Sequence, residues 1–312
     1  MKTITASAPG SVMITGEHAV VYGHPAVVCA IEQRVTVTAT RRTDSQVHIS
    51  SSIADDAAFD LAELPKDGPY RFVLQVVATH KDHLNTGIDI QITSDINPTL
   101  GLGSSSAVTI AALGAVRRHT VLPTDQIAHA EIHSEALSII RAIQGRGSGA
   151  DLAAGVYGGM LSYQLSAHGD EAIVAPLPIP PQLSLAYCGY KTPTADVLAQ
   201  IADRMAGNEE KFEQLYGHMG KSASELITAA KQEDWDAVGA AMADYQTLMV
   251  ELGVSDTKLD ELVTSANSNA GTLGAKISGS GLGDCVIALG DLPDGYTPVT
   301  VAQRGLEVTV HE

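Results

Sequence analysis

Residues 97–107 read NPTLGLGSSSA, in which two glycines and three consecutive serines directly precede an apolar run. The residues before them, GIDIQITSDI at 87–96, alternate apolar and polar side chains, which is typical of a half-buried strand. The residues after them, AVTIAALGAVRR at 107–118, indicate a helix, which we predict over 105–119. The glycines and serines therefore lie in a loop that opens a helix.

Such a loop has two physical uses. Serine is a good helix N-cap and glycine permits tight turns, but capping needs one serine and not three. Alternatively, glycines let the backbone approach a ligand, and the free N–H groups and dipole of a helix start favour an anion such as phosphate. We favour the anion-binding use. The loop is not a Walker A sequence, because no Gly-Lys-Ser/Thr follows it.

Composition limits the classes of protein that the chain can belong to. Its 312 residues suffice for one large domain or two moderate ones, and 45% of them are apolar, although one Trp and three Phe make for an aliphatic core. The formal net charge of −17 argues against a nucleic acid or an anionic membrane as partner. A small anionic ligand is still allowed, because a few local cations suffice to bind it.

The three cysteines, Cys29, Cys188 and Cys285, are far apart and lack metal-ligand spacing, so we expect buried free thiols. The opening MKTITASAPG lacks the apolar core of a signal peptide, and no run approaches the roughly 18 apolar residues of a membrane span. We therefore expect a cytoplasmic protein.

The order of predicted elements is that of an α+β protein with two lobes, the first rich in strands and the second rich in helices. The proline-rich segment APLPIPPQ at 175–182 predicts the junction, with domains at 1–175 and 176–312. Strands are predicted at 4–17, 34–42, 46–52, 87–95, 160–165, 183–190, 274–281, 284–290 and 305–310, and further helices at 70–84, 125–143, 194–207, 209–231, 234–253 and 257–268.

A second chemistry-bearing stretch is APGSVMITGEHAVVYGHPAV at 8–27. Pro9 and Gly10 are expected to end a short strand. A surface turn would account for Gly16 alone, whereas the polar pair Glu17 and His18 before an apolar run favours contact with a substrate.

Two further stretches carry candidate groups. In AIQGRGSGADLAAGVYGG at 142–159, Asp151 either caps a helix or orients a hydroxyl and accepts its proton, close to the cation Arg146. In AKISGSGLGDCVIAL at 275–289, the glycine-serine loop is either a hairpin turn or a close approach of the backbone to a ligand. The length of this loop favours the ligand.

Taken in order, APGS…GEHAVVYG, PTLGLGSSSA and KISGSGLGDC resemble the three motifs of the GHMP kinases, over residues 8–289. The resemblance implies a two-lobed fold with a strand-rich N-terminal domain and a helix-rich, ferredoxin-like C-terminal domain. It also implies ATP and Mg²⁺ as cofactors and a small-molecule substrate. Asp151 would be the catalytic carboxylate, and Ser105 would help to bind Mg²⁺.

The remaining site residues that the resemblance implies fall into two groups. The ATP phosphates would lie on Gly101, Leu102, Gly103, Ser104, Ser105 and Ser106. Substrate contacts are expected from Ser11, Glu17, His18, Arg146, Ser148, Gly149, Lys191, Gly279, Ser280 and Gly281.

The motifs point to different substrates. GEHAVVYG is similar to mevalonate kinases, whereas QGRGSGAD and GDC are similar to phosphomevalonate kinases. From the latter we expect 5-phosphomevalonate to be converted to 5-diphosphomevalonate, with Arg146 and Lys191 binding the substrate's phosphate. Phosphorylation of the mevalonate 5-hydroxyl is the alternative, and a kinase-like binding protein without catalysis is a third reading. A homodimer is also left open.

Two positions depart from the family pattern. Ser11 stands where the family usually carries a lysine that assists the aspartate, so another cation is needed. Ile140 stands where mevalonate kinases carry an acid that helps to bind Mg²⁺, and Glu131 or Glu135 on the same predicted helix could substitute for it.

Overall fold

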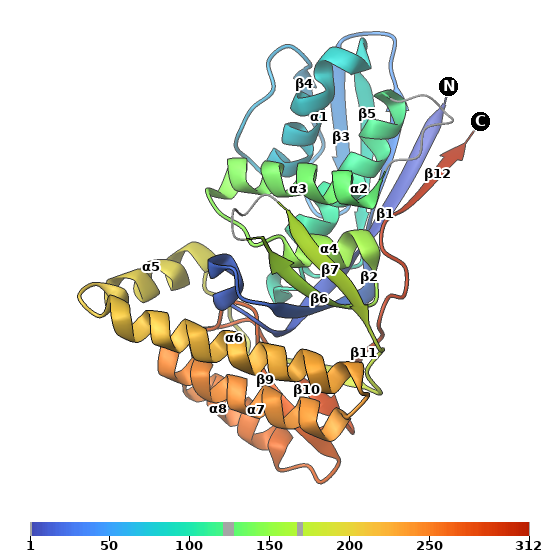
Figure 1. The fold of residues 1–312 in the computed structure, drawn as a ribbon. Coiled ribbons are helices and arrows are strands. Elements are labelled where there is room, and N and C mark those ends of the chain that lie inside the picture. The colour runs from blue at the N-terminus through green and yellow to red at the C-terminus, as the bar shows by residue number, and fades with distance from the viewer. Residues whose placement is uncertain (1, 121–127, 167–170, 312) are drawn as a thin grey trace.

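The structure, a computed structural model, describes residues 2–120, 128–166 and 171–311. Figure 1 shows two lobes, with mixed strands and helices in the upper one and long helices packed on a second sheet in the lower one. This arrangement confirms the predicted α+β fold with a strand-rich first lobe and a helical second lobe. The domain boundary at residue 175 remains a prediction.

The first sheet has eight strands in the order β12-β1-β2-β5-β3-β4, with β6 and β7 branching from β2. All pairs are antiparallel except β3 with β5. The strands are β1 (Thr3–Thr15), β2 (Ala26–Arg41), β3 (Gln46–Ser51), β4 (Ala57–Asp60), β5 (Ile88–Ser94), β6 (Met160–Leu165), β7 (Ala172–Leu177) and β12 (Glu307–His311).

Four helices cover this sheet: α1 (Arg71–Leu84), α2 (Ser104–Thr120), α3 (His129–Gln144) and α4 (Ala150–Tyr157). Helices α2 and α4 pack on β1 and β2, and α1 and α3 pack beside α2 (Figure 1). Alanine residues and a glycine of α2 are buried, and their small size lets this helix lie close to the strands. Of the predicted helix at 125–143, residues 125–127 lie outside the described residues, and α3 begins at His129 after the extended N-cap Ala128.

The prediction that Pro9 and Gly10 end a strand is wrong, because β1 continues through them to Thr15. The pairing of β1 with β2 changes register between the two residues, which accommodates a proline that cannot donate to the ladder. The irregularity brings the strand against the predicted phosphate loop, where Ser11 N donates to Leu102 O at 3.1 Å.

The second sheet is antiparallel in the order β11-β8-β10-β9. Helices α7 and α8 pack on β9, and α6 packs on α7 and reaches the 3₁₀ helix η1 (Ala19–Tyr22) of the first lobe. The elements are β8 (Leu183–Tyr187), α5 (Thr194–Met205), α6 (Glu209–Lys231), α7 (Trp235–Leu252), α8 (Thr257–Asn267), β9 (Thr272–Ser278), β10 (Cys285–Gly290) and β11 (Thr297–Val299).

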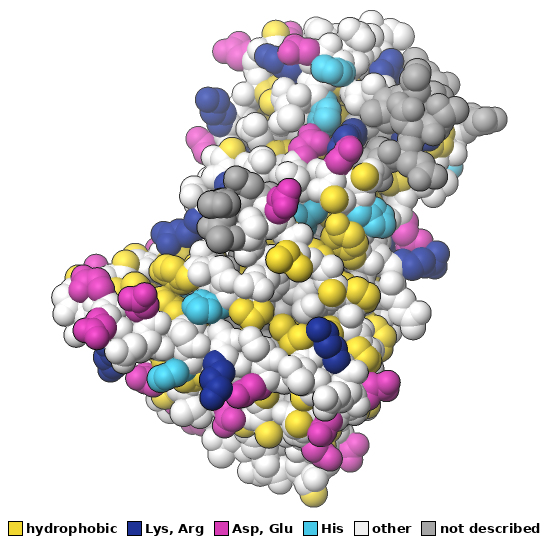
Figure 2. All heavy atoms as spheres, in the orientation of Figure 1, with side chains coloured by type: hydrophobic (Ala, Val, Ile, Leu, Met, Phe, Trp, Pro, Cys, Tyr) yellow, Lys and Arg dark blue, Asp and Glu magenta, His cyan; other side chains and the backbone are white. Residues whose placement is uncertain are grey.

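The core of both lobes is aliphatic, as the composition predicts. Cys29, Cys188 and Cys285 are buried and unpaired, which confirms the expected free thiols. On the face in Figure 2, Lys and Arg side chains stand apart from one another rather than forming one basic patch. None of the described helices is long and apolar enough to cross a membrane.

Candidate active site

The predicted phosphate loop connects the short 3₁₀ helix η2 (Pro98–Leu100) to the start of α2. Gly101 and Gly103 both have φ of 68°, a left-handed conformation that glycine adopts without strain. The N–H groups of the first turn of α2 have no partner within the helix and carry its positive dipole end. The loop therefore offers glycine turns and helix-start N–H groups that suit an anion, and phosphate binding there stays a prediction.

Both lobes pack directly against this loop. A Cβ added to Gly103 would lie 2.2 Å from Ser11 Oγ of β1, and one added to Gly101 would lie 2.7 Å from Asp284 Oδ1. Cys285 Sγ also donates to Leu100 O at 3.2 Å. The loop is thus held between the first strand and the start of β10.

Asp151 lies in the first turn of α4 and points across to β1. Ser11 Oγ donates to Asp151 Oδ1 at 2.8 Å, so this carboxylate is oriented by a buried hydroxyl from another element. Burial raises the pKa of Asp151, while the hydrogen bond from Ser11 and the charge of Lys191 act to lower it. A desolvated carboxylate beside a phosphate loop is suited to orient a hydroxyl and accept its proton.

Lys191 reaches the same place from the loop between β8 and α5. Its Nζ lies 3.6 Å from Asp284 Oδ1, and the Asp284 side chain is only 6% exposed. Burial raises the pKa of Asp284, and the positive charge of Lys191 opposes only part of this rise. Asp284 is a residue that sequence reasoning did not propose for the site, although it belongs to the quoted GDC stretch.

Glu17 and His18 occupy the boundary between the lobes instead of open space. Glu17 Oε1 pairs with Lys276 Nζ at 2.5 Å, and both side chains are buried. His18 Nε2 lies 2.9 Å from Ser280 O, and Tyr245 on α7 donates its hydroxyl to Glu17 O at 2.7 Å. These contacts give the polar pair a structural use, so its direct contact with substrate stays a prediction.

Burial shifts the pKa values of His18 and Lys276 at this boundary between the lobes. Burial lowers the pKa of His18 to about 4, helped by the positive charge of Lys276, although the hydrogen bond to Ser280 opposes the shift. Burial also lowers the pKa of Lys276, and Glu17 opposes that shift. Sequence reasoning did not identify Lys276, because nothing in the local pattern of β9 distinguishes a buried lysine from an exposed one.

The third glycine-rich loop joins β9 and β10 as a hairpin, so the turn reading is correct. Its glycines approach the protein's own backbone: a Cβ on Gly281 would lie 2.3 Å from Val254 O, and Leu282 N donates to that oxygen at 2.7 Å. Thr192 Oγ1 hydrogen-bonds to Leu282 O. Contacts of Gly279, Ser280 and Gly281 with substrate stay predictions.

The stretch before α4 mainly holds the start of that helix. Ser148 Oγ accepts from Ala150 N at 3.3 Å, Tyr163 donates to Ser148 O at 2.5 Å, and His133 Nε2 lies 2.9 Å from Gly149 O. Arg146 is exposed in the same loop. The structure therefore brings Lys191, rather than Arg146, to the two site carboxylates.

Glu131 and Glu135 do not replace the missing magnesium ligand. Both pair with Arg117, and Glu135 also bonds His80 Nε2 at 2.6 Å. Arg117 follows Ser104 by thirteen residues of α2, which is about 20 Å along the helix axis. These carboxylates are therefore far from the phosphate loop, and the prediction that one of them substitutes is wrong.

Ile140 itself has a packing role and offers no ligand to a metal. Its side chain is buried, and a Cβ on Gly147 would lie 3.0 Å from its Cγ2, so it packs under the loop before α4. Within the ranges that the structure describes, no group of three or more His, Cys, Asp or Glu could hold a metal. The role of Ser105 as a ligand of Mg²⁺ stays a prediction.

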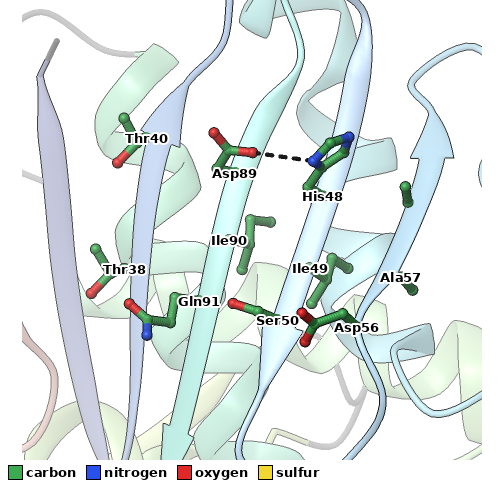
Figure 3. Close-up of a pocket in the computed structure, with 11 residues that line it drawn as sticks. Thr38, Thr40, His48, Ile49, Ser50, Asp56, Ala57, Asp89, Ile90 and Gln91 are labelled. Carbon is green, nitrogen blue, oxygen red and sulfur yellow. Dashed lines mark ion pairs between the residues drawn. The ribbon is translucent and has the colours of Figure 1, made fainter.

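A separate groove of about 630 Å³ lies on the open face of the first sheet (Figure 3). Threonines of β2, Asp89 and Gln91 of β5 and His48 of β3 point into it, and His48 Nδ1 lies 3.7 Å from Asp89 Oδ1. The residues that line this groove include neither the phosphate loop nor Asp151. The groove is therefore distinct from the candidate active site.

The fold and this constellation define an ATP-dependent phosphotransferase. Family models for the GHMP kinases N terminal domain and the GHMP kinases C terminal match residues 71–159 and 226–296, and a galactokinase galactose-binding signature matches residues 1–41. The chain belongs to the GHMP kinase family.

Individual members of the family are similar to this chain over nearly its whole length. The chain is 33% identical to the mevalonate kinase of Pyrococcus furiosus, over 97% of this chain and 93% of that protein. It is 32% identical to the mevalonate kinase of Aeropyrum pernix, over 98% and 92%. A crystal structure of a Lin0012 protein from Listeria innocua superposes with a TM-score of 0.85 at 21% identity, covering 98% of this chain and 99% of that one.

These relatives overturn the expectation that the substrate is 5-phosphomevalonate. The similarity to mevalonate kinases extends over nearly the whole chain, whereas the expectation rested mainly on two short stretches, QGRGSGAD and GDC, taken with YKTPTADVL and the pattern of the whole chain. The structure gives both stretches internal roles, in holding the start of α4 and in pairing Asp284 with Lys191. They are therefore poor guides to the substrate.

Proposed function

We propose that the protein is a mevalonate kinase, which transfers the γ-phosphoryl group of ATP to the 5-hydroxyl of mevalonate. One observation carries the proposal: Asp151, oriented by Ser11 beside the phosphate loop, lies in a chain that resembles mevalonate kinases over nearly its whole length. Mevalonate bears a carboxylate and no phosphate, so its recognition does not require the exposed Arg146.

The residues divide the work of phosphoryl transfer. Glycines 101 and 103 and the start of α2 bind the ATP phosphates through backbone N–H groups. Asp151 orients the mevalonate hydroxyl and accepts its proton as the oxygen–phosphorus bond forms, and the hydrogen bond from Ser11 fixes the carboxylate in place. Ser105 would help to hold Mg²⁺, which would supply charge neutralisation at the phosphates.

The packing of the lobes keeps these groups together. Met13 N donates to Ser278 Oγ at 3.1 Å, and the same hydroxyl donates to Met13 O at 3.0 Å. This contact joins β1, which carries Ser11, to the strand that leads into the third loop. Positioning of this kind is what phosphoryl transfer mainly requires of a protein.

The test is an ADP-release assay with ATP and Mg²⁺, in which mevalonate, 5-phosphomevalonate and galactose are offered separately. We expect turnover with mevalonate only, and a loss of about 10²-fold or more in the Asp151→Asn variant. Asp236→Asn, an exposed aspartate in the first turn of α7, is the matched control and should retain full activity. Turnover with galactose instead would favour the activity suggested by the signature at residues 1–41. Binding of ATP without any turnover would favour a non-catalytic protein.

A further inference from the structure

The ion pair between Lys191 and Asp284 has an unusual setting. Asp284 is nearly buried and has a left-handed φ of 65°, which is uncommon for aspartate, whereas Lys191 is 37% exposed. Asp284 Oδ1 is buried and makes no hydrogen bond to the described residues, so the ammonium group at 3.6 Å is its charged partner. A buried carboxylate in this state needs a nearby positive charge.

Neighbouring backbone fixes Asp284 in place. Its N–H donates to Tyr190 O at 3.1 Å, and Cys188 N donates to Asp284 O at 3.1 Å. Tyr190 directly precedes Lys191, so the segments that carry the two charges are tied together. The carboxylate rests on Gly101 of the phosphate loop, as the 2.7 Å approach to a Cβ at that position shows.

Lys191 also acts on Asp151, the carboxylate of the other lobe. Across residues 2–120, 128–166 and 171–311, the charged side chain that favours ionised Asp151 is Lys191, and the remaining favourable contact is the Ser11 hydroxyl. Other cations of the predicted site are differently placed: Arg146 is exposed in the loop before α4. Lys276 is fully buried against Glu17.

We propose that Lys191 is a catalytic residue that contacts the transferred phosphoryl group, and that Asp284 is a positioning residue that holds Lys191 over the phosphate loop. The proposal rests on the phosphotransfer proposed above. As the bond from the mevalonate oxygen to the γ-phosphorus forms, the bond to the ADP oxygen breaks and Asp151 takes the hydroxyl proton. Lys191 transfers no proton in this step and neutralises charge on the phosphoryl oxygens.

The first experiment compares Lys191→Met and Lys191→Arg by steady-state kinetics with ATP and mevalonate. Loss of one preorganised charge at a reacting centre predicts a fall in kcat of about 10²- to 10³-fold in Lys191→Met, with KM for mevalonate changed much less. Lys191→Arg should recover part of kcat. Lys221→Met, which removes an exposed lysine on α6, is the control and should behave as wild type. An unchanged kcat in Lys191→Met would overturn the proposal.

The second experiment is a double-mutant cycle with Asp284→Asn, which keeps the side-chain shape against Gly101. If Asp284 acts through Lys191, Asp284→Asn lowers kcat in the wild-type background by about tenfold and causes little further loss in the Lys191→Met background. Losses that multiply in the double variant would show that Asp284 acts independently of Lys191, and would overturn its positioning role.

A binding measurement tests the role of Lys191 independently of which acceptor molecule the protein phosphorylates. Isothermal titration calorimetry with Mg²⁺ compares ADP with a non-hydrolysable ATP analogue, in wild type and Lys191→Met. Contact with the γ-phosphoryl group predicts that the variant loses about tenfold more affinity for the analogue than for ADP. Equal losses, or none, would overturn the contact. If wild type turned over no mevalonate, the proposed function would fail while this comparison still decided the role of Lys191.

Discussion

Removal of the buried Lys276 ammonium group should destabilise the protein strongly. In Lys276→Met, Glu17 keeps its place in the interior, where its Oε2 already has no hydrogen-bond partner among the described residues and its Oε1 loses one at 2.5 Å. Breaking a buried ion pair on one side lowers the free energy of unfolding by about 3–5 kcal/mol, because an uncompensated charge remains. With an unfolding entropy of about 2.1 cal/mol/K per residue, a loss of 4 kcal/mol lowers Tm by about 6 °C in a chain of 312 residues.

The assay is calorimetric melting at pH 7.5 of wild type, Lys276→Met and the double variant Glu17→Gln with Lys276→Met. The double variant buries no charge, so it should recover most of the lost stability. Lys221→Met, whose exposed side chain pairs with Glu225 one helical turn away, should melt within about 1 °C of wild type.

Two results would refute this reasoning. Lys276→Met could lose less than about 1 kcal/mol, which would mean that water or a rearranged side chain compensates Glu17. Alternatively, the double variant could melt as low as the single one, which would show that the stability lies in the packing of the lysine stem against Tyr245 rather than in the charge pair.

Further predictions concern pH and the phosphate loop. The pKa of His18 is about 4 in the folded protein and near 6.5 when unfolded, so stability should be complete above pH 6.5 and fall by about 3 kcal/mol toward pH 4; urea unfolding of His18→Gln should show a weaker dependence. Ser11→Ala removes a hydrogen bond that lowers the pKa of Asp151, so the acidic limb of the kcat–pH profile should move to higher pH. Gly103→Ala places a methyl group 2.2 Å from Ser11 Oγ at a positive φ and should weaken ATP-analogue binding at least tenfold by calorimetry. Arg146→Ala should change KM for mevalonate less than about threefold, whereas a large rise would indicate a phosphorylated substrate.

Local periodicity predicts much of the fold. Helices such as α6 and α7 show apolar side chains at helical spacing, and the second half of β2 alternates as expected. The first half of β2 is buried throughout and lies outside the strand predicted at 34–42. The missed strands β4, β7 and β11 are short or contain proline, and their pairing depends on partners elsewhere in the chain. A pattern confined to a few residues does not reveal such pairing.

The sequence likewise indicates some residues of the candidate site and not others. The phosphate loop and Asp151 can be recognised because each lies at a loop-to-helix transition with a distinctive composition. Lys276 could not be recognised, because its partner Glu17 is 259 positions away in the sequence. The substrate was predicted wrongly for a related reason: the GDC stretch reads as a substrate motif until the structure shows that its aspartate pairs with Lys191 inside the protein.

The last strand has a consequence for how the chain folds. β12 pairs with β1, with Thr3 opposite His311, so the neighbour of β1 on this side of the first sheet is supplied by residues that are synthesised long after β1 (Figure 1). Until those residues leave the ribosome, β1 presents an open row of backbone donors and acceptors, which is a template for unwanted pairing with other chains. Contacts this distant in sequence also slow folding. The first lobe thus reaches its final form only after the second has been synthesised, and its open edge in the interval exposes the nascent chain to aggregation.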